Sequence, residues 1–245
     1  MTRRLRAAWR LSRCLIHGLH GLTIVLLRFG ALDAAQRHAC IRWWSVKTLR
    51  VMGIAMQVEG AAHPGGTLLV ANHVSWLDIT ALHAVLPHAR FVAKADVKAW
   101  PLLSHLAHAA GTLYLERERK RDALRVVHLM AQALTAGDTI AVFPEGTTSD
   151  GRALLPVHAN LLQAAIATRT KVQPVALRFS DALLPISEAV EYVGATTLLQ
   201  SMWRVACGEG LVAHLTLLPP RASAQLDRRV LAATLRSDIA ARLTH

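Results

Sequence analysis

The sequence predicts an α/β fold, in which a mixed, mostly parallel β-sheet is flanked by helices and preceded by a basic helical module. Short apolar runs recur along the 245 residues, and segments with helical spacing separate them. The first fifty residues differ from the rest, because they alternate long apolar stretches with basic side chains. We therefore expect a two-helix module at residues 1–53 and an α/β domain at residues 54–245.

The N-terminal module is predicted to contain helices over residues 4–30 and 34–52, the second of them amphipathic. Nine of the twelve excess positive charges lie in residues 1–50, which hold ten basic side chains and one acid, and Trp9, Trp43 and Trp44 lie among them. Arginine and lysine contact lipid headgroups, and indole rings favour the membrane interface. The pattern favours an anionic membrane surface as the partner, over nucleic acid.

The apolar stretch from Cys14 to Leu27 is shorter than the ~20 residues of a spanning helix. An interfacial or re-entrant helix fits better, although a span with snorkelling arginines and a cleaved signal peptide are alternatives. The three cysteines stand far apart without a C-x-x-C pair, which indicates neither a disulfide framework nor a zinc site. These features predict a membrane-associating module on the cytoplasmic face of the inner membrane.

Six apolar runs predict the strands of the sheet. They cover residues 67–71, 90–93, 112–115, 139–143, 172–177 and 211–217. Helical patterns cover residues 119–136, 157–167 and 226–243. Strands thus alternate with helices, which is typical of a sheet covered on both faces.

Residues 72–78 (N-H-V-S-W-L-D) follow the first of these strands directly. His73 is therefore expected at the carboxyl edge of the sheet, where open α/β folds place ligand sites. If Asp78 accepts a hydrogen bond from one imidazole nitrogen, the other nitrogen can act as a base. The structural alternative is that Ser75 and Asp78 form a capping box at a helix start and that His73 is an ordinary loop residue.

Residues 143–151 (F-P-E-G-T-T-S-D-G) follow a second apolar strand. This loop offers the carboxylate of Glu145, two glycines and three hydroxyl groups. Backbone N–H groups and hydroxyls in such a loop can hold a polyol or a phosphate.

Four segments together resemble the sequence blocks of the glycerolipid acyltransferases, which include 1-acylglycerol-3-phosphate acyltransferase. N-H-x-S-x-x-D and F-P-E-G-T resemble the first and third blocks, and residues 111–117 and 172–176 resemble the second and fourth. The resemblance implies an enzyme of phospholipid biosynthesis. It would transfer a fatty acyl group from acyl-CoA or acyl-carrier protein to a lysolipid hydroxyl, most directly that of 1-acylglycerol-3-phosphate, to give phosphatidic acid.

The resemblance also implies residue roles. His73 would take the proton of the acceptor hydroxyl while Asp78 orients the ring, without an acyl-enzyme. The residues expected to bind the acceptor are Arg117, Glu145, Gly146, Thr147 and Lys94. No metal and no redox cofactor are implied.

One position departs from the family pattern. Members that form phosphatidic acid commonly have arginine where this chain has Thr148. The F-P-E-G-T-T form resembles branches that acylate lyso-ornithine lipid or lysophospholipids with substituted headgroups. Acylation of such a lysolipid is therefore the alternative function.

Other functional classes have weaker support. A noncatalytic membrane-binding or nucleic-acid-binding protein would leave the His73–Asp78 pair unused, and a lipase or thioesterase would replace the acceptor hydroxyl with water. Thr147 occupies the first glycine position of a G-x-S-x-G elbow, which argues against a serine nucleophile. Residues 208–213 resemble a dinucleotide fingerprint but lead into a strand, so we expect a turn there.

Overall fold

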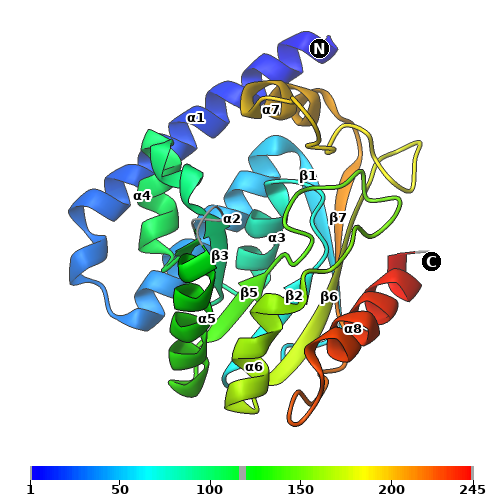
Figure 1. The fold of residues 1–245 in the computed structure, drawn as a ribbon. Helices are drawn as coiled ribbons and strands as arrows, with labels where there is room; N and C mark the ends of the chain where they lie inside the picture. Colours follow the sequence, from blue (N-terminus) through cyan, green and yellow to red (C-terminus); the bar gives the residue numbers. More distant parts are fainter. Residues whose placement is uncertain (1, 116–119, 244–245) are drawn as a thin grey trace.

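The computed structural model describes residues 2–115 and 120–243, and their strands form a seven-stranded mixed sheet (Figure 1). The strands are β1 (Ile54–Glu59), β2 (Thr67–Ala71), β3 (Arg90–Lys94), β4 (Leu113–Leu115), β5 (Thr139–Val142), β6 (Lys171–Ser180) and β7 (Leu211–Leu217). Their order across the sheet is β1-β7-β6-β2-β5-β3-β4, and every neighbouring pair is parallel except β6 and β7. The predicted mixed, mostly parallel sheet is confirmed.

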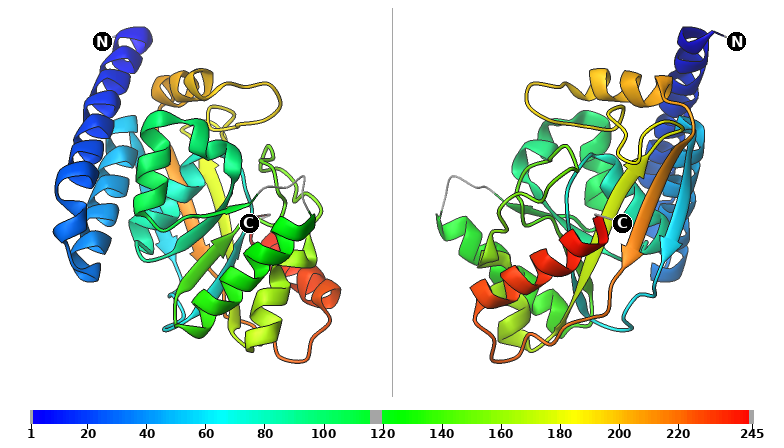
Figure 2. Two further views of the ribbon diagram at one scale, coloured as in Figure 1. Left: turned by 60° about the vertical axis from the view of Figure 1, so that its left-hand side comes forward. Right: turned by 90° about the vertical axis from the view of Figure 1, so that its right-hand side faces the viewer.

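Helices cover both faces of this sheet (Figure 2). The α-helices are α1 (Arg3–Leu27), α2 (Ala34–Met52), α3 (Leu77–Val85), α4 (Pro101–Ala109), α5 (Lys120–Thr135), α6 (Gln163–Thr168), α7 (Leu198–Cys207) and α8 (Arg228–Leu243). Short 3₁₀ turns are η1 (Phe29–Ala31), η2 (Ala95–Ala99) and η3 (Ala159–Leu162). Helices α5, α6 and α8 lie on one face, and α1, α2 and α3 lie on the other.

The central strand β2 shows why both faces are covered. All five of its residues are buried. Leu69 and Ala71 point into the core beneath α2 and α3, whereas Leu68 and Val70 point into the core beneath α5, α6 and α8. Successive side chains of a strand alternate between faces, so a continuous apolar run requires a helical layer on each side.

The N-terminal helices α1 and α2 form a closely packed antiparallel pair. Gly21 on α1 faces Trp44, and a Cβ at residue 21 would lie 2.5 Å from the indole nitrogen. His17, buried on the same face, lies 3.0 Å through its Nε2 from the carbonyl oxygen of Trp44. Gly21 therefore faces α2, whereas Gly18 faces Leu102 of α4, and the large apolar side chains of α1 point outward.

The outward face of α1 is apolar and exposed. Its exposed large side chains are Leu5, Trp9, Leu15, Ile16, Leu19, Leu26 and Leu27. Within residues 2–115 and 120–243, no helix combines the length and the apolar character needed to cross a bilayer.

Two of the N-terminal arginines serve the fold directly. Arg10 donates from Nη1 to the carbonyl oxygens of Ala206 and Gly208, at 3.0 and 2.7 Å, and Arg6 pairs with Glu209. Both contacts lie at the C-terminal end of α7, where exposed carbonyls favour a cation. Part of the excess positive charge of residues 1–50 is therefore engaged in contacts within the molecule.

Most predicted elements are confirmed within a few residues, but three are missed. Strand β1 is an edge strand in which only Ile54 is buried, so it lacks a strong apolar pattern. Helices α4 and α7 are short, nine and ten residues, and each lies in a stretch for which we predicted no element. Gly53 ends α2 with φ 80° immediately before β1; the division into domains at residues 53 and 54 stays a prediction.

Candidate active site

The turn between β2 and α3 brings His73 and Asp78 together. Asp78 is fully buried, and its Oδ2 lies 2.7 Å from Nδ1 of His73. The same oxygen accepts the N–H groups of Val74 and Ser75, at 2.7 and 2.9 Å. Three donors fix one carboxylate oxygen, so the orientation of the imidazole is set before any ligand binds.

The predicted capping box forms only in part. Asp78 accepts the N–H of Ser75, as a box requires, but the N–H of Asp78 donates to the carbonyl of Ser75. The hydroxyl of Ser75 is buried and has no hydrogen-bond partner within the part of the chain that the structure describes, and Trp76 holds the N-cap position. The carboxylate turns toward His73 instead of serving the helix alone.

The ring of His73 leaves its second nitrogen available. With Nδ1–H donating to Asp78, Nε2 is the unprotonated nitrogen, and no hydrogen bond to Nε2 occurs within the described residues. The side chain is 19% exposed, and its ring stacks on Phe143 with 4.1 Å between centroids. His73 is therefore held on two sides and open at the atom that can accept a proton.

The loop of residues 143–151 fixes the backbone of His73. The N–H of His73 donates to Oε1 of Glu145 at 2.7 Å, and its carbonyl accepts from the N–H of Ser149 at 2.8 Å. Oε2 of Glu145 accepts the N–H of Leu155 at 2.8 Å. Burial raises the pKa of Glu145, and the N–H groups of Leu155 and His73 oppose that rise. Glu145 thus connects three loop segments at the carboxyl edge of the sheet.

The other predicted acceptor-binding residues are arranged less tightly. Gly146 has φ 74°, which a residue with a Cβ rarely adopts, and Thr147 beside it is exposed. Lys94 is an exposed residue at the carboxyl end of β3, on the same edge of the sheet as His73. Arg117 lies outside the described residues. Acceptor binding by all of these residues, Glu145 included, stays a prediction.

Sequence reasoning missed several residues that build this site. Asn72 ties the end of β2 to β6, since its side chain exchanges hydrogen bonds of 2.7 and 2.8 Å with the backbone of Leu177. Trp76 donates from Nε1 to the hydroxyl of Ser201 on α7 at 3.1 Å. Asn72 lies inside the N-H-x-S-x-x-D segment and could have been suspected, whereas nothing near Ser201 marks its partner.

The described residues contain no group of three or more His, Cys, Asp or Glu side chains that could hold a metal ion. The contact between His73 and Asp78 makes general-base catalysis by an oriented imidazole available to this arrangement. It can remove a proton from a hydroxyl that approaches Nε2.

Comparison with known proteins assigns this arrangement to a family. Residues 55–178 match the family described as Acyltransferase. The chain is 37% identical over 203 residues to a lyso-ornithine lipid O-acyltransferase of Pseudomonas aeruginosa, covering 83% of this chain and 78% of that protein. It is 40% identical over 161 residues to a 1-acyl-sn-glycerol-3-phosphate acyltransferase of Neisseria gonorrhoeae, covering 64% and 62% of the two chains.

The fold has a solved counterpart. The crystal structure of the 1-acyl-sn-glycerophosphate acyltransferase PlsC from Thermotoga maritima superposes with a TM-score of 0.69 over 96% of both chains, at 19% sequence identity. At that identity the likeness concerns the fold alone. The matched residues 55–178 contain His73, Asp78 and Glu145, and together with the P. aeruginosa relative they show that this chain belongs to the acyltransferase family.

Proposed function

We propose that this enzyme transfers a fatty acyl group from an acyl thioester to the free hydroxyl of a lysolipid, with His73 as the general base. Nε2 of His73 takes the hydroxyl proton as the hydroxyl oxygen attacks the thioester carbonyl. The C–S bond then breaks, the acyl group remains on the acceptor oxygen, and the proton leaves with the thiol. The observation that supports this most is the 2.7 Å contact between His73 and the buried Asp78, which leaves Nε2 as the base.

Asp78 supports the reaction without touching the substrate. Its Oδ2 is held by two backbone N–H groups as well as by the imidazole. The charge that develops on the ring during proton transfer therefore meets a fixed carboxylate, and no side chain must move to stabilise it. Glu145 and Ser149 further restrain His73, because Glu145 accepts its backbone N–H and the N–H of Ser149 donates to its backbone carbonyl.

The acceptor that we propose first is 1-acylglycerol-3-phosphate, which would give phosphatidic acid. The N. gonorrhoeae relative is named for this substrate. Lys94 lies on the same edge of the sheet as His73, and an ammonium group there suits a phosphate monoester. Arg117 is proposed as the second phosphate ligand, since a guanidinium can bind two phosphate oxygens at once.

Lyso-ornithine lipid is the second candidate acceptor, and Thr148 favours it. The hydroxyl of Thr148 donates to the carbonyl of Tyr192, so this position offers neither a cation nor a free donor to a phosphate. The P. aeruginosa relative that aligns with 83% of this chain is named for lyso-ornithine lipid. An ornithine headgroup has an amine and a carboxylate in place of a phosphate, and it therefore needs fewer cations.

Membrane attachment is proposed through α1, at the cytoplasmic face of the inner membrane. The outward face of α1 exposes seven large apolar side chains, and four exposed arginines, Arg3, Arg4, Arg13 and Arg28, lie within or next to the same helix. An amphipathic helix of this kind lies in the interface, with its apolar face among the acyl chains and its cations on anionic lipid. Acyl-CoA or acyl-carrier protein would deliver the donor from the aqueous side.

The decisive experiment is a product assay with the purified full chain in mixed micelles. A labelled long-chain acyl-CoA is supplied with 1-acylglycerol-3-phosphate, with lyso-ornithine lipid, or with no acceptor, and the labelled products are separated. Acylated lysolipid supports the proposal. Free fatty acid without acylated product would show a thioesterase, and no turnover with either acyl-CoA or acyl-carrier protein as donor would rule out both of these acceptors.

A single variant tests which of the two acceptors the enzyme prefers. Thr148→Arg should raise kcat/KM for 1-acylglycerol-3-phosphate relative to lyso-ornithine lipid by roughly 10-fold, since a new cation would meet the phosphate. Thr148→Val, which removes only the hydroxyl, serves as the matched control. An unchanged preference in Thr148→Arg would remove residue 148 from acceptor selection.

A further inference from the structure

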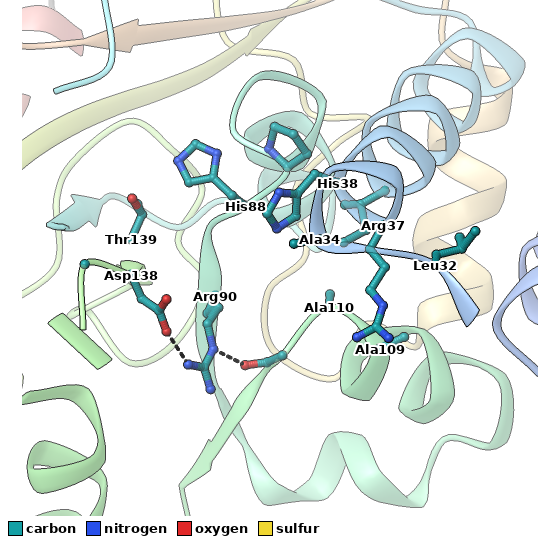
Figure 3. Close-up of a pocket in the computed structure, with 14 residues that line it drawn as sticks. Leu32, Ala34, Arg37, His38, His88, Arg90, Ala109, Ala110, Asp138 and Thr139 are labelled. Atoms are coloured by element: carbon teal, nitrogen blue, oxygen red, sulfur yellow. Dashed lines mark hydrogen bonds and ion pairs between the residues drawn. The ribbon is translucent and has the colours of Figure 1, made fainter. Parts of the chain in front are cut away.

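A cavity lies at the amino-terminal ends of the central strands, at the opposite edge of the sheet from His73. Its volume is about 510 Å³, and α2, the loop before β3, the end of α4 and the start of β5 line it (Figure 3). Arg90 opens β3, and Asp138 immediately precedes β5, which runs parallel to β2. His73 instead follows the carboxyl end of β2. The cavity is therefore separate from the site of acyl transfer.

Two arginines face this cavity, and each is anchored by backbone or acidic partners. Arg90 donates from Nη1 to Asp138 at 2.5 Å and from Nε to the carbonyl of Gly111 at 3.0 Å. Arg37 donates to the carbonyls of Phe29 and Gly30, at 3.0 and 3.3 Å. These bonds use Nε and one terminal nitrogen of each guanidinium. The other terminal nitrogen of each makes no hydrogen bond within the described parts of the chain, and guanidinium groups held in this way suit oxyanion recognition.

Two histidines from different elements complete the basic lining. His38 on α2 and His88 before β3 have ring centroids 6.0 Å apart. Neither ring makes a hydrogen bond among residues 2–115 and 120–243. Burial lowers the pKa of His88, and the neighbouring His38 lowers it further. An anion between the two rings would offset this effect and favour the protonated form of His88.

The charge of the cavity is positive at neutral pH and rises on acidification. Asp138 is its acidic group and is paired with Arg90, so Arg37 leaves one net positive charge while both histidines are neutral. Protonation of His88 would raise the net charge to two. The remaining side chains of the lining are apolar except for the hydroxyl of Thr139, and they include Leu32, Ile41, Pro87 and the alanines at 109 and 110.

We propose that this cavity binds the phosphate group of an anionic ligand, at a second site distinct from the acceptor site at His73. The apolar side chains beside the basic groups favour the headgroup of a membrane phospholipid over free phosphate as the source. The position supports this source, because η1 joins the cavity-lining start of α2 to the end of α1, where Leu26 and Leu27 are 60% and 78% exposed. A lipid whose headgroup enters the cavity could keep its acyl chains beside these leucines.

The test uses the full chain in zwitterionic micelles and three soluble probes: dihexanoylphosphatidylglycerol, dihexanoylphosphatidylcholine and inorganic phosphate. Binding is followed by calorimetry and by the NMR pH titration of the histidine ring protons. We expect dihexanoylphosphatidylglycerol to raise the pKa of His88, and the double variant His38→Ala/His88→Ala to weaken its binding roughly 10-fold. His128→Ala, which changes an exposed histidine of α5, is the matched control, and His73→Ala should bind normally.

The probes separate the sources of the phosphate group. Tighter binding of dihexanoylphosphatidylglycerol than of inorganic phosphate would establish a lipid headgroup site, and equal binding would establish a free-phosphate site. If neither anion shifts the titration of His88, or if the double variant and His128→Ala bind alike, the proposal fails. Thermal unfolding of each variant shows whether a loss of binding reflects a loss of fold.

Discussion

The turn after β2 and the outer face of α1 differ in which side chains are buried: the turn buries charged groups, whereas α1 exposes apolar ones. At the turn, the carboxylates of Asp78 and Glu145 are buried, and short hydrogen bonds hold them. On α1, leucine and isoleucine side chains stand in solvent, and Ile16 is 67% exposed.

This contrast separates what is complete in the isolated chain from what needs a partner. Buried, paired carboxylates fix the geometry of a base before the substrate arrives. Exposed apolar side chains contribute stability only when another surface covers them. We therefore expect substitutions at the turn to slow the chemical step both on membranes and in micelles. Substitutions on α1 should instead change the fraction of the enzyme that is bound to membranes.

The largest effect is expected for His73→Ala. Loss of the general base should lower kcat by roughly 10³-fold, within the range typical of a positioned acid–base group. The thermal unfolding temperature should stay near that of the parent, because the side chain of His73 is partly exposed. Vesicle binding should also be unchanged, because His73 is not part of α1. Turnover within a few fold of the parent would refute the role of His73 as base.

A smaller loss is expected for Asp78→Asn. The amide keeps the shape of the carboxylate but cannot stabilise a positive imidazole, and it disturbs the three donors that now share one oxygen. We expect kcat to fall by about 10²-fold while the acceptor KM changes little. Asp33→Asn is the control, since asparagine also caps the start of α2. A purely structural Asp78 would lower stability without this kinetic pattern.

The membrane face is tested by the double variant Leu19→Ser/Leu26→Ser. If this face of α1 enters the bilayer as proposed, removing two leucines should weaken partitioning to anionic vesicles by at least about 10-fold, since each leucine contributes on the order of 1 to 3 kcal/mol when fully buried. Activity in detergent micelles should be preserved. Leu124→Ser, on the exposed side of α5, should leave partitioning unchanged. Equal effects of the two variants would mean that α1 is not the membrane face.

A buried histidine of α3 links the stability of the fold to pH. His83 lies one turn and a half after Asp78 on α3, and burial lowers its pKa to about 4. The unfolded chain binds a proton on this residue below about pH 6.5, and the folded chain does so only near pH 4. Stability is therefore present above pH 6.5 and lost as pH falls toward 4, by up to about 1.4 kcal/mol per pH unit.

Urea unfolding at several pH values between 4.5 and 7.5 measures this slope. His83→Gln can still donate a hydrogen bond to the carbonyl of Ala89, which His83 contacts at 3.0 Å, and it should flatten the slope over this range. His128→Gln, at an exposed position, should leave the slope as it is. A slope that is the same in both variants would assign the acid sensitivity to another group.

The contact between His73 and Asp78 could be predicted because it is local. His73 and Asp78 are five residues apart, and the apolar strand before them places both at the edge of the sheet. The hydrogen bonds that hold the backbone of His73 were not predictable in the same way, since Glu145 and Ser149 are 72 and 76 residues away along the chain. Their presence in one loop was visible, but their hydrogen bonds to the backbone of His73 depend on β2 and β5 being neighbours.

The sequence by itself determined most of the strands and helices, since buried runs and helical spacing are properties of neighbouring residues. Only the tertiary structure decided which strands pair, that β6 and β7 are antiparallel, and that β1 closes one edge of the sheet with little apolar pattern of its own. The tertiary structure also decided which partners the charged side chains contact. Arg6 and Arg10 look like their neighbours in sequence, yet they bind the end of α7 about 200 residues away. A local pattern fixes a residue's conformation, whereas its partner depends on packing of the whole chain, which no short segment encodes.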